Sequence, residues 1–189
     1  MRVVGVCGSL QERSTTAAVL ASVADLVTAA PTPVEAGADG GPALIEYHRF
    51  RGIDRLPHFN PDHDDDPAHP EVATWRNALA AADAVVIATP EYAHSYPGAL
   101  KDALDWTVGS GELVDKPVLL VTASGGGGVH AGEALAQVLR AMSAQVIGPV
   151  SIWGVSPKIA DDRLTDVDDL SALAAAVTVL LTHADPHRP

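Results

Sequence analysis

The sequence has only one cysteine, Cys7, so the chain cannot form an internal disulfide, which fits a reducing cytoplasm. It is also poor in basic residues, because 12 Lys and Arg stand against 24 Asp and Glu, for a net charge of −12. Nucleic acid and anionic lipid are bound mainly through basic patches, so we expect neither as a partner. No apolar run reaches the roughly 18 residues that cross a bilayer, and the apolar start is too short for a signal peptide. These absences predict a cytoplasmic protein with no membrane partner.

Two phosphate-binding signatures are missing as well. The Walker pattern G-x-x-x-x-G-K-[ST] does not occur, and neither does the dinucleotide fingerprint G-x-G-x-x-G.

An acidic run at 62–66 lies between His58 and His69 and has the residue types of a metal site. The run precedes a helix that Pro70 opens, so we interpret it as charging the N-terminus of that helix and predict no metal.

Hydrophobic residues make up 47% of the chain and form short apolar runs that alternate with longer segments of helical period. The runs predict strands at 2–7, 44–48, 84–89, 118–122 and 146–153. The periodic segments predict helices at 15–30, 70–82, 97–107, 129–142 and 166–182. Continuous apolar strands separated by helices indicate a parallel sheet covered on both faces. The sequence therefore predicts a flavodoxin-like α/β fold, a three-layer sandwich with a doubly wound, five-stranded parallel sheet.

We expect residues 1–184 to form a single domain, with a surface loop at 31–42 and a frayed tail at 185–189. In a doubly wound sheet, ligands bind beyond the carboxyl ends of the strands. Three predicted connections fall there, which we name loop one (residues 8–16), loop two (89–98) and loop three (124–128). The candidate site is therefore sought in these loops.

Loop one joins a buried strand to a helix and is rich in hydroxyl groups. Its candidate ligand-binding residues are Ser9, Gln11, Arg13, Ser14, Thr15 and Thr16. Backbone N–H groups at the start of a helix favour an anion, and Arg13 adds a positive charge. Taken alone, the loop fits a phosphate monoester site and an ordinary Ser/Thr helix cap equally well.

Loops two and three have features that suit a flat ligand. Loop two carries two tyrosines, a histidine and a glutamate, and Pro90 and Pro97 stiffen it. Such a loop can lay Tyr92 or Tyr96 along a planar ligand, although tyrosines that only cover a sheet edge are the commoner case. Loop three is Ser124 followed by four glycines, which either let the backbone approach a flat ligand closely or form a flexible turn.

Together the three loops resemble the NADPH-dependent FMN reductase family of flavodoxin-like proteins, which includes flavin, quinone, azo-dye and chromate reductases. The family motif G-S-L-R-x-G-S-x-N is similar to GSLQERSTT at 8–16. The motif P-E-Y-N-x-S-x-P-G-x-L-K-N-A-I-D-W is similar to PEYAHSYPGALKDALDW at 90–106, and this second match is long and specific. The Ser/Gly turn at loop three is a looser match. The resemblance covers residues 3–150.

The resemblance implies an FMN-dependent NAD(P)H oxidoreductase that works as a homodimer or homotetramer. Hydride would pass from NADPH or NADH to bound FMN and on to a small-molecule acceptor such as a quinone, free flavin or azo compound. Loop one would bind the FMN phosphate, while loops two and three would hold the isoalloxazine ring. The residues implied beside the ring are Pro90, Glu91, Tyr92, Ala93, His94, Ser124, Gly125, Gly126 and Gly127. No catalytic acid or base is implied, because the cofactor carries the chemistry.

Three positions depart from the family motifs. Gln11 stands where Arg is usual, Thr16 where Asn is usual, and Ala93 where Asn is usual. We expect these changes to weaken the affinity for FMN. Two other hypotheses remain open: a flavin-binding electron carrier or sensor without nicotinamide turnover, and a phosphate-ester binding module that takes no flavin.

Overall fold

The computed structural model describes residues 1–30, 44–64 and 69–184. Its centre is a parallel five-stranded sheet in the order β2-β1-β3-β4-β5. The strands are β1 (Arg2–Cys7), β2 (Glu46–Phe50), β3 (Ala84–Thr89), β4 (Pro117–Ser124) and β5 (Gln145–Trp153). This strand order is that of flavodoxin-like doubly wound sheets, so the predicted fold class is confirmed.

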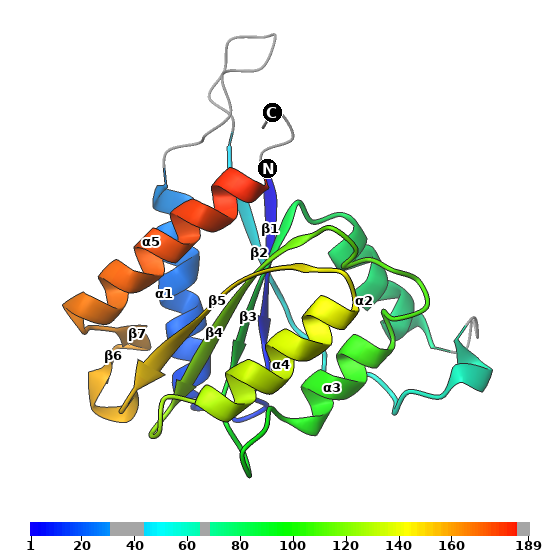
Figure 1. Ribbon diagram of the computed structural model, residues 1–189, viewed down its shortest axis with the longest axis horizontal. Helices are drawn as coiled ribbons and strands as arrows, with labels where there is room; N and C mark the ends of the chain where they lie inside the picture. Colours follow the sequence, from blue (N-terminus) through cyan, green and yellow to red (C-terminus); the bar gives the residue numbers. More distant parts are fainter. Residues whose placement is uncertain (31–43, 65–68, 185–189) are drawn as a thin grey trace, which may run out of the picture.

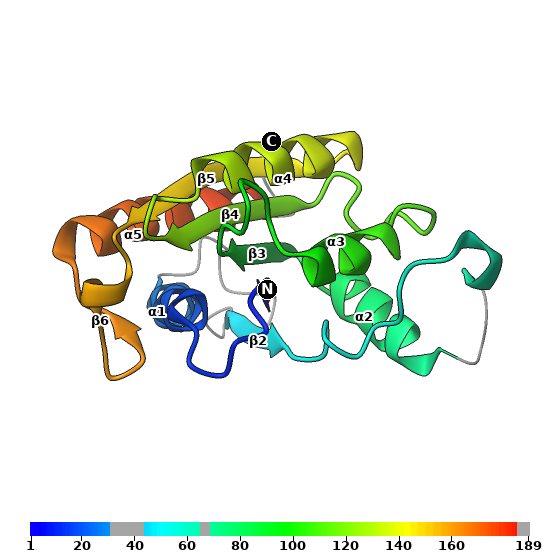
Figure 2. The same ribbon diagram turned by 90° about the horizontal axis from the view of Figure 1, so that it is seen from below.

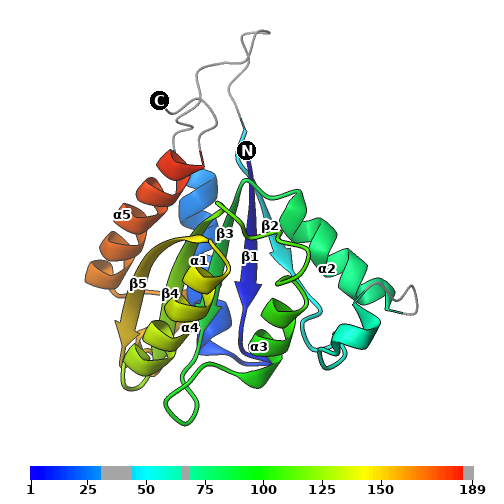
Figure 3. The ribbon, with the colours of Figure 1, turned by 45° about the vertical axis from the view of Figure 1, so that its right-hand side comes forward.

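Helices cover both faces of the sheet and make three layers (Figure 1). The helix α1 (Thr15–Ala29) and the helix α5 (Val167–His183) lie on one face (Figure 3). The other face carries α2 (Pro70–Ala80), α3 (Gly98–Asp105) and α4 (Val129–Ala141). None of the helices in the described ranges is long and apolar enough to span a bilayer.

The central strand β3 shows how one apolar run serves two cores. All six of its residues are buried. Val86 and Ala88 belong to the core under α1 and α5, whereas Val85 and Ile87 belong to the core under α2, α3 and α4. Successive side chains of a strand point to opposite faces, so a strand covered on both sides must be apolar throughout.

The edge strand β2 differs from its prediction. The apolar pattern placed it at 44–48, but it runs from Glu46 to Phe50 and pairs in parallel with β1. Only Phe50 is buried, because β2 has a single neighbour in the sheet and is covered less than the central strands. An edge strand can carry charged side chains such as that of Arg49, so hydrophobicity alone places its ends poorly.

Several short elements were not predicted. They are the hairpin β6 (Ile159–Ala160) with β7 (Arg163–Leu164) and the 3₁₀ turns Pro61–His63 and Ser156–Lys158. Each is only two or three residues long, which is too short for a periodic pattern. The predicted surface loop at 31–42 and the predicted frayed tail at 185–189 lie outside the described residues.

The described part of the acidic run does not cap α2 as the sequence suggested. Asp64 pairs with Arg76 of α2 at 2.5 Å, and the N-cap of α2 is His69, which makes no side-chain capping bond. Asn60 caps the preceding 3₁₀ turn. Among the described residues, no group of three or more His, Cys, Asp or Glu side chains is placed to hold a metal ion.

All five strands of the sheet point the same way, so loops one, two and three meet at one edge of the sheet. In Figure 1 this edge faces downward, and Figure 2 views the molecule from that side. The fold therefore brings together three segments that are far apart in the sequence.

Candidate functional site at the carboxyl edge of the sheet

Loop one is held at both ends by hydrogen bonds. The N–H of Gly8 donates to a carbonyl of β3 at 2.8 Å, which places the loop beside that strand. The hydroxyl of Ser9 accepts from the N–H of Gln11 at 3.3 Å. Ser14 is the N-cap of α1, and its hydroxyl accepts from the N–H of Ala17 at 3.2 Å. The helix-cap interpretation is therefore correct for Ser14.

The cap does not use all the donors at the start of α1. The N–H groups of Thr15 and Thr16 find no acceptor in the described part of the chain, as expected for the first turn of a helix. These free donors and the positive end of the helix dipole favour an anion at this point. Arg13 is exposed one residue before the cap. The cap and the predicted phosphate site are thus compatible.

Loop two forms a tight hairpin. Tyr92 and Ser95 exchange both backbone hydrogen bonds, at 2.8 and 3.0 Å. The two residues between them, Ala93 and His94, have φ angles of 50° and 59°. Positive φ at both positions defines a type I′ turn, for which Asn-Gly is the preferred pair. The preference of this turn for Asn therefore explains why the family motif has Asn at the position of Ala93.

The structure separates the two tyrosines of loop two. Tyr92 stands 53% exposed at the edge of the sheet. Tyr96 is partly buried and packs against the core under α2, α3 and α4, and this burial raises the pKa of its phenol. Tyr92 is therefore the ring that a ligand can reach, while Tyr96 and the buried Pro90 hold the hairpin on the protein.

Glu91 joins loop two to the helix that follows loop three. Its Oε2 accepts from the N–H of Ala131, in the first turn of α4, at 3.0 Å. The N-cap of α4 is Gly128, which has no side chain to do this. The other oxygen, Oε1, lies 3.8 Å from Nδ1 of His94, whose ring packs edge-on against His130 with centroids 4.5 Å apart. The carboxylate of Glu91 thus replaces a missing cap and fixes loops two and three to each other.

The glycines of loop three fall into two pairs. Gly127 and Gly128 have φ angles of 76° and 70°, and a Cβ on Gly127 would lie 2.3 Å from the ring of Trp153. These two are glycines because the turn itself requires them. Gly125 and Gly126 do not have positive φ, and a Cβ on either would meet nothing within 4 Å. The space in front of this second pair is open to a ligand.

Trp153 is a site residue that the sequence interpretation missed. It ends β5 next to loop three, and 55% of it is exposed. The N–H of Gly154 donates to the carbonyl of Gly125 at 3.3 Å, which holds this strand end against the loop. Loop three therefore lies between two exposed rings, Tyr92 from the side of β3 and Trp153 from the side of β5. The available signal was an aromatic residue at the carboxyl end of a strand.

Comparison with known proteins agrees with this geometry. The family model for NADPH-dependent FMN reductase matches residues 1–156. The quinone reductase of Escherichia coli K12 is 34% identical over 138 residues, which are 70% of this chain and 73% of that protein. The NADH:(hydroxy)cinnamate reductase subunit CrdA of Vibrio ruber is 46% identical over 100 residues, so the match covers 51% of this chain but only 48% of that protein. Among solved structures, the flavoenzyme NAD(P)H:(acceptor) oxidoreductase FerB of Paracoccus denitrificans has a TM-score of 0.77 and 25% identity, with 98% of each chain covered.

Proposed function

Because the chain belongs to the family of NADPH-dependent FMN reductases, we propose that loops one, two and three hold one FMN between them and that a quinone receives its electrons. Membership confirms the predicted class, an oxidoreductase that uses FMN and NAD(P)H. The observation that carries the proposed site is the open backbone of Gly125 and Gly126, set between the exposed rings of Tyr92 and Trp153.

The phosphate of FMN fits loop one. The free N–H groups of Thr15 and Thr16 and the hydroxyls of Ser9 and Ser14 are donors of the kind that a phosphate monoester accepts from. With a net charge of −12, the protein as a whole repels a phosphate, so these local donors must supply the binding energy. Gln11 in place of Arg removes one charge-assisted bond, which supports the expectation of a weaker affinity.

The isoalloxazine ring fits loops two and three. A flat ring can approach Gly125 and Gly126 closely because no side chain stands in front of them. The chemistry that FMN supplies when bound is hydride uptake from a nicotinamide and electron release to an acceptor. The part of this chain is to bind and orient. The N–H groups of Gly125 and Gly126 would stabilise negative charge on the ring without a titratable side chain, whereas that of Gly127 already donates to Ser124. Tyr92 and Trp153 shield the ring from water at two sides, and Glu91 keeps loops two and three in register.

The quinone is proposed on the likeness to the quinone reductase of Escherichia coli. Azo compounds are the second acceptor class to test, since a relative from Bacillus sp. that is 35% identical over 97 residues is an NADPH azoreductase. Both acceptor classes are flat and small, and both suit a ring with one exposed face. NADH and NADPH remain alternative donors.

Three broader expectations belong to the same proposal. We propose that residues 1–184 form one FMN-binding domain, that the protein is cytoplasmic, and that it assembles as a homodimer or homotetramer. Leu104 and Trp106 are fully buried and cannot contact a partner, so we expect an interface near the end of α3 to use the exposed Val108 and Val114. Sedimentation velocity of the wild type and of Val108→Glu tests the assembly, and cell fractionation tests the location.

The decisive experiment is spectroscopic. The protein is mixed with FMN, desalted, and its visible absorbance is recorded before and after NADPH is added under argon. Retained flavin bands that bleach, and that return when a benzoquinone is added, support the proposal. Retained bands that do not bleach would indicate a carrier or sensor. Desalted protein without flavin bands, even after loading at high FMN, would contradict the proposed site.

A further inference from the structure

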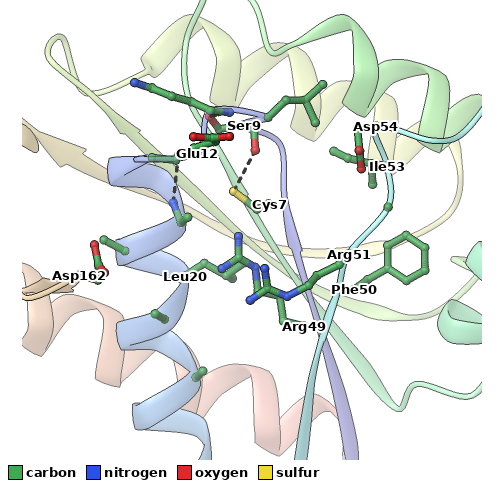
Figure 4. Close-up of a pocket in the computed structure, with 18 of the residues that line it drawn as sticks. Cys7, Ser9, Glu12, Leu20, Arg49, Phe50, Arg51, Ile53, Asp54 and Asp162 are labelled. Carbon is green, nitrogen blue, oxygen red and sulfur yellow. Dashed lines mark hydrogen bonds between the residues drawn. The ribbon is translucent and has the colours of Figure 1, made fainter.

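A cavity lies between loop one, α1 and the edge strand β2 (Figure 4). It has a volume of about 690 Å³, which is within the range of small-molecule sites. Apart from Leu20, the residues of α1 that line it are alanines (Ala17, Ala18, Ala21 and Ala24), so the helix leaves room in front of the strand. Five residues of loop one also line it, and no residue of loops two and three does; the five are Ser9, Leu10, Gln11, Glu12 and Ser14.

The opposite wall of the cavity is polar because of the alternation along β2. Tyr47 packs with the core under α1 and α5, whereas Phe50 packs with the core on the other face. Arg49 is two residues from Tyr47 and therefore faces the same side, and Arg51 continues this row just beyond the strand. Figure 4 shows the side chains of Arg49 and Arg51 reaching from β2 into the space in front of α1.

Two polar atoms of this wall are buried and have no partner. They are the hydroxyl of Tyr47 and Nε of Arg49, and within the described ranges these are the only buried side-chain polar atoms without a hydrogen bond. The Tyr47 hydroxyl lies over Gly5 of β1, where a Cβ would come within 1.8 Å of it. Buried polar groups in proteins are normally hydrogen-bonded, so this pair indicates a missing ligand or solvent partner.

Two of the three arginines that line the cavity also lack an ionic partner. The third, Arg163, pairs with Asp25, and outside the cavity Arg76 pairs with Asp64. Arg49 and Arg51 have no carboxylate within 4.0 Å in the described part of the chain, although acids outnumber basic residues two to one in the sequence. Glu12, Asp54 and Asp162 also line the cavity and are exposed, as Arg51 is, but none of these three carboxylates lies within 4.0 Å of the guanidinium of Arg49 or Arg51.

We propose that this cavity is a second anion site, which binds a small molecule through a phosphate monoester held by Arg49, Arg51 and the Tyr47 hydroxyl. A guanidinium offers several N–H donors in a plane that matches phosphate, and the phenol adds a further donor. The phosphate group has two possible sources, the 2′-phosphate of NADPH and a free phosphorylated metabolite. The cavity shares Ser9 and Ser14 with the proposed phosphate site of loop one, whereas Arg49, Arg51 and Tyr47 belong to β2 and its end and take no part in the proposed flavin site.

The test is calorimetric titration of protein saturated with FMN, using adenosine 2′,5′-bisphosphate and adenosine 5′-monophosphate as probes. We expect binding that weakens at least about tenfold in Arg49→Gln and in Arg51→Gln, the loss of one hydrogen bond to a charged group. Arg140→Gln is the matched control, because Arg140 is an exposed arginine on α4, across the sheet. Arg49→Lys, which keeps the charge, should restore part of the affinity.

The two probes identify the source. Arginine-dependent binding of the bisphosphate alone supports the proposal with NADPH as the source, and equal arginine-dependent binding of both supports it with a free metabolite. No binding, or equal affinity in all variants, would overturn the proposal. Probe binding that appears only when FMN is left out would also overturn it, because the probe would then occupy loop one. FMN retention is measured separately on the wild type, so failure of the flavin site and failure of this site are distinguishable.

Discussion

Replacing Ala93 with glycine is expected to stabilise the protein. Ala93 is the first of the two turn residues in loop two and has a φ of 50°. A side chain with a Cβ pays about 1–2 kcal/mol in this left-handed region, because the Cβ crowds the following carbonyl oxygen. Glycine avoids the clash but loses about 0.5–1 kcal/mol more backbone entropy on folding. The net gain in the free energy of unfolding is therefore about 0.5–1 kcal/mol.

The gain is measurable as a shift in melting temperature. For a chain of this length, 1 kcal/mol corresponds to about 2–4 °C, so Ala93→Gly should melt about 1–4 °C higher than the wild type. The control is Ala172→Gly on the exposed side of α5, where the backbone is helical. There the same chemical change should lower the free energy of unfolding by about 0.5–1 kcal/mol. Opposite signs for the two variants are expected, and a lower melting temperature for both would refute the reasoning on the turn.

Three further outcomes test the site. Gly127→Ala should lower the free energy of unfolding by at least about 1–2 kcal/mol, because the positive φ alone costs that much and the new Cβ also clashes with Trp153. Gly126→Ala should leave it unchanged but weaken FMN retention, and equal effects of the two variants on melting would contradict the division of the glycines. Glu91→Gln keeps an acceptor for the N-terminus of α4 but loses the charge there, so the free energy of unfolding should fall by about 0.3–1 kcal/mol. Urea unfolding measures this loss, which would be absent if the carboxylate were merely solvated. Tyr47→Phe removes a buried hydroxyl without a partner and should gain about 1 kcal/mol at pH 8. Burial also raises the pKa of this phenol above its ordinary 10.0, so above pH 10 the unfolded chain ionises while the folded protein does not, and the wild type loses stability as the pH rises. Urea unfolding at pH 8 and 11 should therefore show the advantage of the variant growing with pH, and an unchanged advantage would contradict this.

The parts of the fold that were predictable are those where burial is uniform. The bounds of β3 follow from the sequence because each of its residues is covered on both faces. The bounds of β2 do not, because its coverage is uneven and it carries charge. The position of the three loops at one edge was predictable as well, since it follows from strand direction alone.

Contacts between distant segments were not predictable. The hydrogen bond between Glu91 and Ala131 joins residues 40 apart in the chain, and it depends on how loop two and the start of α4 are positioned relative to each other at the edge of the sheet. The exposure of Trp153 depends on where β5 ends relative to β4. The row formed by Tyr47 and Arg49 could be read only after the register of β2 was known. These features require the spacing of strands across the sheet, which a single sequence does not contain.

The two edges of the sheet bear on how copies of this chain can meet. An exposed edge strand is a template for further strand pairing, in assembly or in aggregation. Here β5 carries Pro149, which has no N–H to donate, and its register against β4 shifts at this point. At the other edge, β2 exposes Glu46 and His48. The proline interrupts the donors of the β5 edge, and the exposed side chains of β2 are polar, so both edges disfavour further strand pairing, and we expect an oligomer to use helices and loops.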